Sequence, residues 1–269
     1  MTAPDAQAHL VIDDVSKVFD GDGRKMVALQ HISLEIPHGQ FVCLLGPSGC
    51  GKSTLLNAVA GFAPPTSGRV LADGVPVAGP GPERGMVFQE YALFPWMTVE
   101  QNVGFGLEIK GMPRAQIAAR VADLLQLLSL EDFAKRYPKD LSGGMRQRVA
   151  IARVLALDSP ILLMDEPFGA LDALTRRNLQ DELLRLWAEL RKTVIFVTHS
   201  IEEAIYLADR IVVMTYRPGT IKRDILVELP RLRDPAAPEF NALKRELGLM
   251  VMEEQQRHHD AEIKAAAVD

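Results

Sequence analysis

The sequence has few of the features that would place the chain in a membrane or in an oxidising compartment. Its 269 residues include two cysteines. Cys43 lies in an apolar segment and Cys50 in a glycine-rich one, and neither position suggests a disulfide. No run of about 18 apolar residues is present, so we predict no membrane-spanning helix. Residues 1–17 lack the basic start and apolar stretch of a signal peptide, and we therefore expect a cytoplasmic protein with reduced thiols.

Basic residues are also scarce relative to acidic ones. The chain has 30 Lys and Arg against 35 Asp and Glu, which gives a formal net charge of −5. Proteins that bind nucleic acid usually present a basic face, so this balance argues against nucleic acid as the partner. It does not exclude a small basic pocket for a nucleotide. The chain is long enough for one large or two small domains, and it contains no internal repeat.

Strands alternate with helices over most of the chain, which predicts a largely parallel sheet covered on both faces. From about residue 91 to 158 this alternation is interrupted by helical patterns, one of which begins at Pro113. From about residue 236 the chain is helical and charged. The segments that predict strands are 9–19, 27–36, 41–45, 85–89, 160–167, 193–199 and 210–216, and the glycine- and proline-rich segment 61–85 predicts short strands joined by turns.

A glycine-rich segment, GPSGCGKS at 46–53, follows the apolar run at 41–45 and precedes a helical pattern. It satisfies the spacing G-x-x-x-x-G-K-[ST] in the strand–loop–helix context that the motif requires. Glycines let the backbone wrap phosphate oxygens, Lys52 supplies a positive charge to the β- and γ-phosphates, and the Ser53 hydroxyl can ligate Mg²⁺. The segment predicts a nucleotide-phosphate site, in which Cys50 contributes only its backbone N–H.

Two later apolar strands end in polar side chains. ILLMDEP at 161–167 carries Asp165 and Glu166 at its end, where a strand buried on both faces tolerates carboxylates. Asp165 suits the Mg²⁺ shell, and Glu166 suits polarising an attacking water. VIFVTHS at 194–200 ends in His199, which could contact a γ-phosphate or that water. Downstream of a phosphate loop, these residue types predict chemistry rather than helix capping.

Three further positions have weaker signals. Gln89 follows an apolar strand and could touch Mg²⁺ or the attacking water. Phe19 is a candidate stacking surface for an adenine, although an aromatic residue at a strand end is more often part of the core. In LSGGMRQRVAIARVL, at 141–155, a serine and two glycines open a helix. The first N–H groups of a helix form a second seat for an anion.

Together these motifs resemble the ATP-binding subunits of ABC transporters. The resemblance rests on the phosphate loop, the glutamine loop VFQEYALFPWMTVEQNV, the signature LSGGMRQR, the acidic strand and aspartate loop LLMDEPFGALD, and the switch histidine in VTHS. It implies an α/β fold: a P-loop NTPase core of the RecA-like kind with a mostly parallel sheet, an N-terminal antiparallel β part and a helical insertion at about 91–158. The ABC ATPase domain is expected to span 1–235, followed by a helical tail at 236–269.

The resemblance also implies a head-to-tail dimer, in which each nucleotide lies between the phosphate loop of one copy and the signature helix of the other. The resemblance implies ATP and Mg²⁺ as cofactors, and Glu166 and His199 as the catalytic residues. Mg²⁺ is assigned to Ser53, Gln89 and Asp165. The residues expected to bind ATP are Phe19, Gly46, Pro47, Ser48, Gly49, Cys50, Gly51, Lys52, Ser53, Thr54, Gln89, Ser142, Gly143, Gly144, Gln147 and Asp172.

An apolar segment follows Gln89. In EYALFPWMTVEQNV, the residues LFPW at 93–96 lie in a stretch too interrupted by proline for a core helix. One interpretation is local packing. The other is a docking site for a cytoplasmic helix of a membrane-spanning permease, with Trp96 as its anchor. Since the sequence predicts no span of its own, the permease would be a separate polypeptide.

Finer features resemble the nitrate, sulfonate and taurine import group of bacterial ABC systems. They are FPWMTVEQNV and RPGTIKRDILVELPR, although PRLRD at 230–234 stands where the group commonly has PRPRD. The resemblance implies a peripheral protein at the cytoplasmic face of the inner membrane, working with a permease and a periplasmic substrate-binding protein. It leaves open which small anion or zwitterion is imported. Two alternatives also remain: a soluble ABC-type ATPase acting on nucleic acid or the ribosome, and an exporter ATPase.

Overall fold

The computed structural model describes residues 8–21 and 24–266. The chain divides into two compact units, Met1–Pro80 with Thr193–Asp269 and Gly81–Lys192. Part of the segment searched for a signal peptide, residues 1–7, lies outside the described residues. Within the described ranges, none of the helices has the length and apolar character needed to cross a bilayer. Both cysteines are buried and free, which confirms that they form no disulfide.

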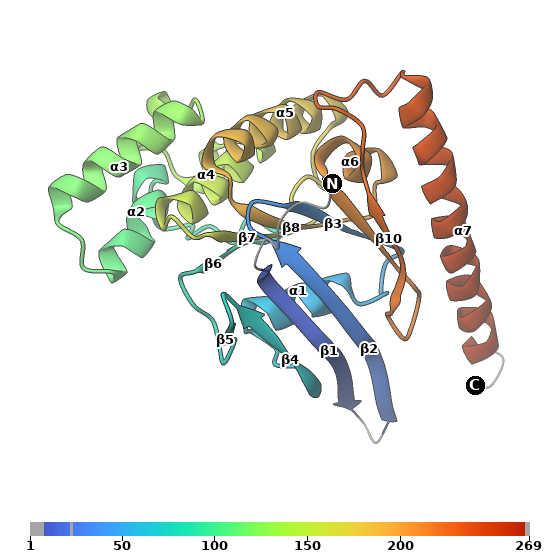
Figure 1. Cartoon of the computed structure of the whole chain (residues 1–269). Helices are drawn as coiled ribbons and strands as arrows, with labels where there is room; N and C mark the ends of the chain where they lie inside the picture. The colour runs from blue at the N-terminus through green and yellow to red at the C-terminus, as the bar shows by residue number, and fades with distance from the viewer. Residues whose placement is uncertain (1–7, 22–23, 267–269) are drawn as a thin grey trace. The chain divides into compact units, whose positions relative to one another are not determined.

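The first unit contains an antiparallel sheet at the N-terminal end of the chain. Its strand order is β2-β1-β4-β5, so β1 lies between β2 and β4 and pairs antiparallel with both. Figure 1 shows β1 and β2 as a long ribbon with β4 beside β1. The predicted antiparallel part is therefore confirmed. The four strands are β1 (Ala8–Gly21), β2 (Arg24–Pro37), β4 (Ser67–Ala72) and β5 (Val75–Pro76).

The same unit contains strands in the order β10-β9-β3-β8. The central strand β3 (Phe41–Leu45) runs parallel to β8 (Thr193–Thr198) and β9 (Arg210–Met214). Every residue of β3 and β8 is buried, as their unbroken apolar runs predict for strands covered on both faces. At the edge, β10 (Ile221–Leu226) pairs antiparallel with β9. The sequence pattern did not predict β10, because its charged side chains at 222–224 break the strand periodicity.

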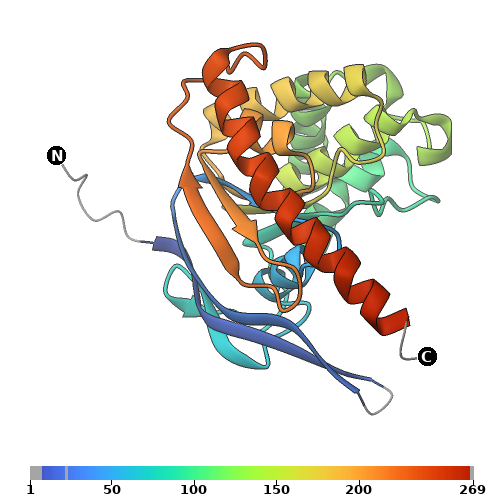
Figure 2. The same cartoon turned by 90° about the vertical axis from the view of Figure 1, so that its right-hand side faces the viewer.

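The described residues of the first unit form three helices: α1 (Lys52–Ala60), α6 (Ile201–Leu207) and α7 (Pro238–Ala266). The long helix α7 begins two residues after the predicted start of the tail. Its residues Phe240, Leu247 and Val251 are buried. Figure 2 shows α7 running past the β9–β10 hairpin, and polar contacts join the two elements. The tail thus packs on the first unit, while the predicted boundary at residue 235 stays a prediction.

The second unit contains a pair of parallel strands and most of the helices. β6 (Arg84–Val87) pairs with β7 (Ile161–Asp165), and the helical insertion lies between them in sequence. β6 ends at Val87, so Gln89, predicted at a strand end, lies in the following turn. The four α-helices are α2 (Val99–Ile109), α3 (Arg114–Leu127), α4 (Gly143–Ala156) and α5 (Ala173–Leu190).

Candidate active site

The phosphate loop connects β3 to α1 in the first unit, as its sequence context predicts. Lys52 is almost fully buried, with 4% of its surface exposed. Its Nζ donates hydrogen bonds to the carbonyl oxygens of Gly46, at 2.8 Å, and Pro47, at 2.9 Å. These bonds hold the ammonium group inside the curve of the loop. A charge fixed there adds to the N–H groups of the loop and of the start of α1, which suits a phosphate.

Gly51 shows why the loop needs glycine. Its backbone adopts φ 99°, a left-handed conformation that side chains rarely accept. A Cβ atom at this position would lie 2.6 Å from Leu29 Cδ2 and 3.0 Å from the Ala28 carbonyl oxygen. Gly51 is also the N-terminal cap of α1. The close packing of the loop on β2 therefore requires glycine at this position, independently of any phosphate.

Cys50 is a thiol inside this loop. Burial raises the pKa of Cys50, and the nearby Lys52 ammonium lowers it only in part. Its Sγ lies 3.8 Å from Lys52 Nζ. The thiol is therefore protonated near neutral pH and is a poor nucleophile. This agrees with the prediction that Cys50 offers its backbone rather than its side chain.

His199 lies beside the phosphate loop in the first unit. Thr198, the residue before it, pairs with Leu45, the residue before Gly46. The carboxyl ends of parallel strands β3 and β8 therefore bring the histidine and the loop to one edge of the sheet, the usual place for ligands in such sheets. His199 is exposed, and Ser200 caps the following helix α6 with its side chain. His199 and the phosphate loop thus lie at the same edge of the sheet, and contact of His199 with a γ-phosphate stays a prediction.

Phe19 is not part of the core. It lies in β1, and 41% of its surface is exposed. Lys17 Nζ is 5.4 Å from the centre of its ring. An exposed ring beside a cation offers a flat surface on which an adenine can stack. The structure thus argues against the core interpretation of Phe19, and adenine stacking stays a prediction.

Arg217 contacts the phosphate loop, and sequence reasoning did not single it out. Its Nε donates a hydrogen bond to the carbonyl oxygen of Gly49, at 3.1 Å. The guanidinium also lies over the ring of Tyr216, 5.8 Å from its centre. Since 168 positions separate Arg217 from Gly49 in sequence, no local pattern could have revealed this contact.

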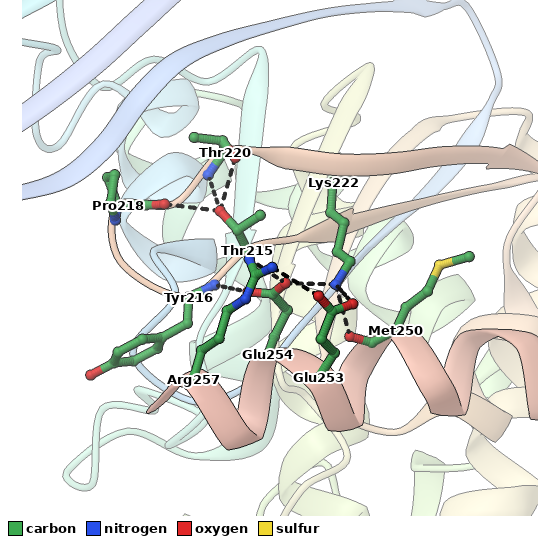
Figure 3. Close-up of polar contacts among 9 residues, drawn as sticks. All are labelled: Thr215, Tyr216, Pro218, Thr220, Lys222, Met250, Glu253, Glu254 and Arg257. Carbon is green, nitrogen blue, oxygen red and sulfur yellow. Dashed lines mark hydrogen bonds and ion pairs between the residues drawn. The ribbon is translucent and has the colours of Figure 1, made fainter. Parts of the chain in front are cut away.

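The β9–β10 hairpin, whose turn carries Arg217, is anchored to α7 (Figure 3). The Tyr216 N–H donates to the Glu254 carboxylate at 2.9 Å, and Lys222 Nζ donates to Glu253 and Glu254 at 2.6 Å each. The Glu254 side chain is fully buried. Burial opposes the charge on Lys222, but its hydrogen bonds to the two glutamates raise its pKa above the ordinary value. The tail helix thus supports the segment that holds the phosphate loop.

The second unit places the acidic pair as predicted, at the carboxyl end of β7. Val87 at the end of β6 pairs with Met164, so Asp165, the last residue of β7, and Gln89, two residues after β6, lie at neighbouring ends of parallel strands. Glu166 adopts φ 43°, a left-handed conformation that is uncommon for a residue other than glycine. Such backbone strain is typical of functional positions, where it aims a side chain. Within this unit, Gln89 and the two carboxylates are brought to one edge.

The segment after Gln89 is held rigidly within the second unit. The buried Asn102 accepts a hydrogen bond from the Phe94 N–H at 2.9 Å, and its amide donates to the carbonyls of Phe94, Met97 and Thr98. Arg153 of α4 donates to the carbonyl of Ala92 at 2.6 Å. Trp96 is nevertheless 70% exposed. Its ring contacts that of Phe94, with the centroids 5.8 Å apart, so local packing holds part of Trp96, and docking on a permease stays a prediction.

The signature segment forms the N-terminus of α4. Ser142 is exposed, and its side chain caps the helix by accepting a hydrogen bond from the Met145 N–H at 3.3 Å. A Cβ atom on Gly144 would lie 2.6 Å from Thr175 Cγ2 of α5, so this glycine is required by packing. Gln147 is fully buried, and its amide forms no hydrogen bond with the described residues. A nucleotide contact for Gln147, unlike one for Ser142, would need α4 to rearrange.

Asp172 caps α5 at its exposed N-terminus. Its side chain accepts a hydrogen bond from the Thr175 N–H at 3.0 Å. This hydrogen bond lowers the pKa of Asp172, so the carboxylate is charged near neutral pH. The aspartate loop therefore has a structural role in the cap, whether or not it also approaches a nucleotide.

Comparison with known proteins agrees with this arrangement. The ABC transporter family matches residues 29–169. An uncharacterized ABC transporter ATP-binding protein of Methanocaldococcus jannaschii is 50% identical over 90% of each chain. The nitrate import ATP-binding protein NrtD of Synechocystis is 47% identical over 88% of this chain and 90% of its own. The corresponding values for the taurine import ATP-binding protein TauB of Roseobacter denitrificans are 46%, 91% and 96%.

A solved structure supports the same conclusion. It is the dimeric, post-hydrolysis state of the ATP-binding cassette MJ0796 bound to ADP and Pi. The TM-score is 0.73 at 34% identity, over 82% of this chain and 100% of that one. The predicted fold, a P-loop ABC ATPase with an antiparallel part and a helical insertion, is confirmed. The chain therefore belongs to the ABC transporter family, as one of its ATP-hydrolysing subunits.

Proposed function

We propose that the chain powers an importer for a small anion or zwitterion of the nitrate, sulfonate or taurine kind. The observation that carries the proposal is the similarity to NrtD and TauB, which covers about nine-tenths of the chain in each case. In this proposal the ATPase binds a separate permease at the cytoplasmic face of the inner membrane, and a periplasmic substrate-binding protein delivers the cargo.

Two copies form the working unit, head to tail. Lys52 and the loop N–H groups bind the triphosphate of one copy, and Ser142, Gly143 and Gly144 of the other copy complete the shell around the γ-phosphate. Support comes from the two helix N-termini, one beside the buried Lys52 and one capped by the exposed Ser142. The dimeric cassette bound to ADP and Pi is a related case. ATP then stabilises the closed dimer, and its hydrolysis removes the charge that holds the halves together.

Glu166 is the proposed general base, and His199 contacts the γ-phosphate or the attacking water. The hydroxyl of Ser53, the amide oxygen of Gln89 and the carboxylate of Asp165 are all oxygen donors, the ligand type that fits Mg²⁺. When bound, the ion neutralises charge on the β- and γ-phosphates. The remaining proposed ATP contacts are Phe19, Pro47, Ser48, Gly49, Cys50, Gly51, Thr54, Gln147 and Asp172.

The catalytic assignment is tested by Glu166→Gln. We expect ATP hydrolysis by the purified chain to fall by about 10²–10⁴-fold, the usual contribution of a positioned base. ATP binding should persist, and an ATP-bound dimer should accumulate in size-exclusion chromatography. Hydrolysis at the wild-type rate would show that Glu166 is not the base.

The transport assignment is tested in cells of the source organism. Deletion of the gene should abolish growth on taurine as sulfur source or on nitrate as nitrogen source, and Trp96→Ala should fail to restore it while the purified variant keeps its ATPase activity. Leu226→Ala is the matched control, because Leu226 is similarly exposed at 64% but lies on β10. Full complementation by Trp96→Ala would refute the docking role, and unchanged growth of the deletion strain on both compounds would refute the substrate class.

A further inference from the structure

Three segments meet at one end of the antiparallel sheet, outside the nucleotide motifs. Because β1 lies between β2 and β4, its first residues adjoin the last residues of both neighbours: Leu10 pairs with Ile36 and with Ala72. The Asp73 N–H also donates to the His9 carbonyl at 2.8 Å. His9 in β1, His38 after β2 and Asp73 after β4 are thereby brought together by strand register.

The side chains of these three residues offer one ligand atom each. Asp73 Oδ2 lies 3.4 Å from His9 Nε2, and Asp73 Oδ1 lies 3.1 Å from His38 Nε2. All three ligand atoms lie within 4.8 Å of one another. Around a tetrahedral Zn²⁺ with ligands at about 2.0–2.1 Å, neighbouring ligand atoms are about 3.3 Å apart. The two carboxylate–imidazole separations are near that spacing but involve different oxygens of Asp73, so the exposed carboxylate has to rotate to offer one oxygen beside both rings.

His9 supplies a second, independent observation. Its side chain is 2% exposed, yet Nε2 forms no hydrogen bond with the described residues. Nδ1 lies 2.6 Å from Thr193 Oγ1, which also accepts a hydrogen bond from the Gly39 N–H. If Nδ1 carries the proton and donates it to Thr193, Nε2 presents a lone pair towards the Asp73 carboxylate. A cation between these two acceptors satisfies both, and an oriented Nδ1–H is the usual support of a metal-binding histidine.

We propose that His9, His38 and Asp73 bind one divalent transition-metal ion of the Zn²⁺ type, with water completing its coordination. Two imidazoles and one carboxylate favour Zn²⁺ over Mg²⁺, which prefers oxygen ligands only. His38 and Asp73 are 60% and 58% exposed, so solvent reaches the site. The rings of His9 and His38 are stacked, with centroids 3.8 Å apart. Binding therefore requires the exposed His38 ring to tilt until its Nε2 lone pair points at the ion.

The ion would tie the start of β1 to the ends of β2 and β4. Its expected effect is on the stability of the antiparallel sheet and not on ATP hydrolysis, since none of the three residues belongs to the nucleotide motifs. The competing arrangement is a hydrogen-bonded His–Asp–His cluster without metal, and the experiment below distinguishes the two.

The test uses the full chain with Co²⁺ and Zn²⁺ as probes. We expect one Co²⁺ per chain with the visible spectrum of a tetrahedral site, displacement by Zn²⁺ in calorimetry, and a higher melting temperature with Zn²⁺. His38→Gln and Asp73→Asn replace exposed side chains, so the fold should survive, and each should weaken binding by more than about tenfold. Thr193→Val removes the hydroxyl that supports His9, together with the acceptor of the Gly39 N–H, and should weaken Co²⁺ binding by about 10–100-fold.

The matched control is His31→Gln. His31 is 69% exposed and pairs with Asp14 at 2.7 Å, but it has no place in the three-residue group. Its replacement should leave Co²⁺ affinity and the Zn²⁺-dependent rise in melting temperature unchanged. The proposal is overturned if wild type binds no metal, if His38→Gln and Asp73→Asn bind as wild type does, or if only replacement of His258 and His259 removes binding.

Discussion

The phosphate loop in the first unit and the signature segment in the second unit are two seats for an anion, built in different ways. The phosphate loop has a buried ammonium group, Lys52, held by two carbonyl oxygens. The signature segment has an exposed serine at a helix N-terminus, and the first turn of α4 contains no acidic residue. A helix N-terminus alone contributes about half a positive charge. The first seat is thus equipped to bind phosphate alone, whereas the second is suited to complete a site that another molecule begins.

The phosphate loop and the signature segment also require glycine for different physical reasons. In the phosphate loop, Gly51 is required by a left-handed backbone and by contact with β2. In the signature segment, Gly144 is required by the approach of α5. The glycines of both motifs are therefore required in part by packing, although the sequence patterns indicate phosphate binding. Substitutions at the two seats should separate nucleotide binding, dimer formation and folding.

The largest effect is expected at the first seat. Lys52→Ala removes the buried charge and should lower ATP hydrolysis by about 10²–10³-fold, as loss of a charge-stabilising donor commonly does. Because the proposed function assigns the triphosphate to this site, the ATP affinity of the isolated chain should fall too, measured with a fluorescent analogue. Lys139→Ala, at an exposed lysine, is the control. Unchanged ATP affinity in Lys52→Ala would contradict the distinction between the seats.

The second seat should behave differently. Ser142→Ala should leave ATP binding by the isolated chain intact but lower hydrolysis by about 10–100-fold, the value of one hydrogen bond to a charged group. In a Glu166→Gln background it should also reduce the ATP-dependent dimer in sedimentation. Thr98→Ala removes a comparable helix cap in the same unit and should do neither. If Ser142→Ala and Thr98→Ala lost the ATP-dependent dimer equally, Ser142 would act only as a helix cap.

Packing at the second seat gives a smaller effect. Gly144→Ala forces a Cβ against Thr175 Cγ2 and should destabilise the chain by about 1–3 kcal/mol in urea unfolding. Thr175→Ser removes that methyl group, so the double variant should recover most of the loss. Gly248→Ala in α7 meets no atom within 4 Å and should instead stabilise by about 0.4–1 kcal/mol. If Gly144→Ala were as stable as wild type, α5 would have moved away from the added Cβ at no cost in stability.

The smallest effect concerns the cap of α5. Since the pKa of Asp172 is lowered in the folded chain, its charge stabilises the fold above the ordinary value of 3.8, and this stabilisation is lost as the pH falls through the folded-state pKa. Asp172→Asn keeps a good cap but removes the titration. Wild type should therefore be slightly more stable than Asp172→Asn at pH 7, and the gap in urea midpoints should close near pH 3. A gap that is independent of pH would contradict this.

Much of the fold followed from local patterns. The strands β3, β7 and β8 were predicted because buried parallel strands read as unbroken apolar runs. The phosphate loop was predicted because its chemistry lies within eight consecutive residues. In contrast, β10 was missed, since an edge strand with charged side chains has no such run. The helix α2 was placed only within a helical region, although Thr98 and Gln101 form a capping box at its start.

Local sequence thus determined the identity of each seat: the residues of the phosphate loop, the acidic pair and the signature cap. Only the tertiary structure decided that Phe19 is exposed, that Arg217 holds the loop, and that Glu254 supports the hairpin behind it. It also decided that His9, His38 and Asp73 meet. The physical reason is range. Turn geometry, capping and apolar periodicity depend on residues that are close in sequence. Strand register and packing join residues tens to hundreds of positions apart, and no short sequence pattern predicts such contacts.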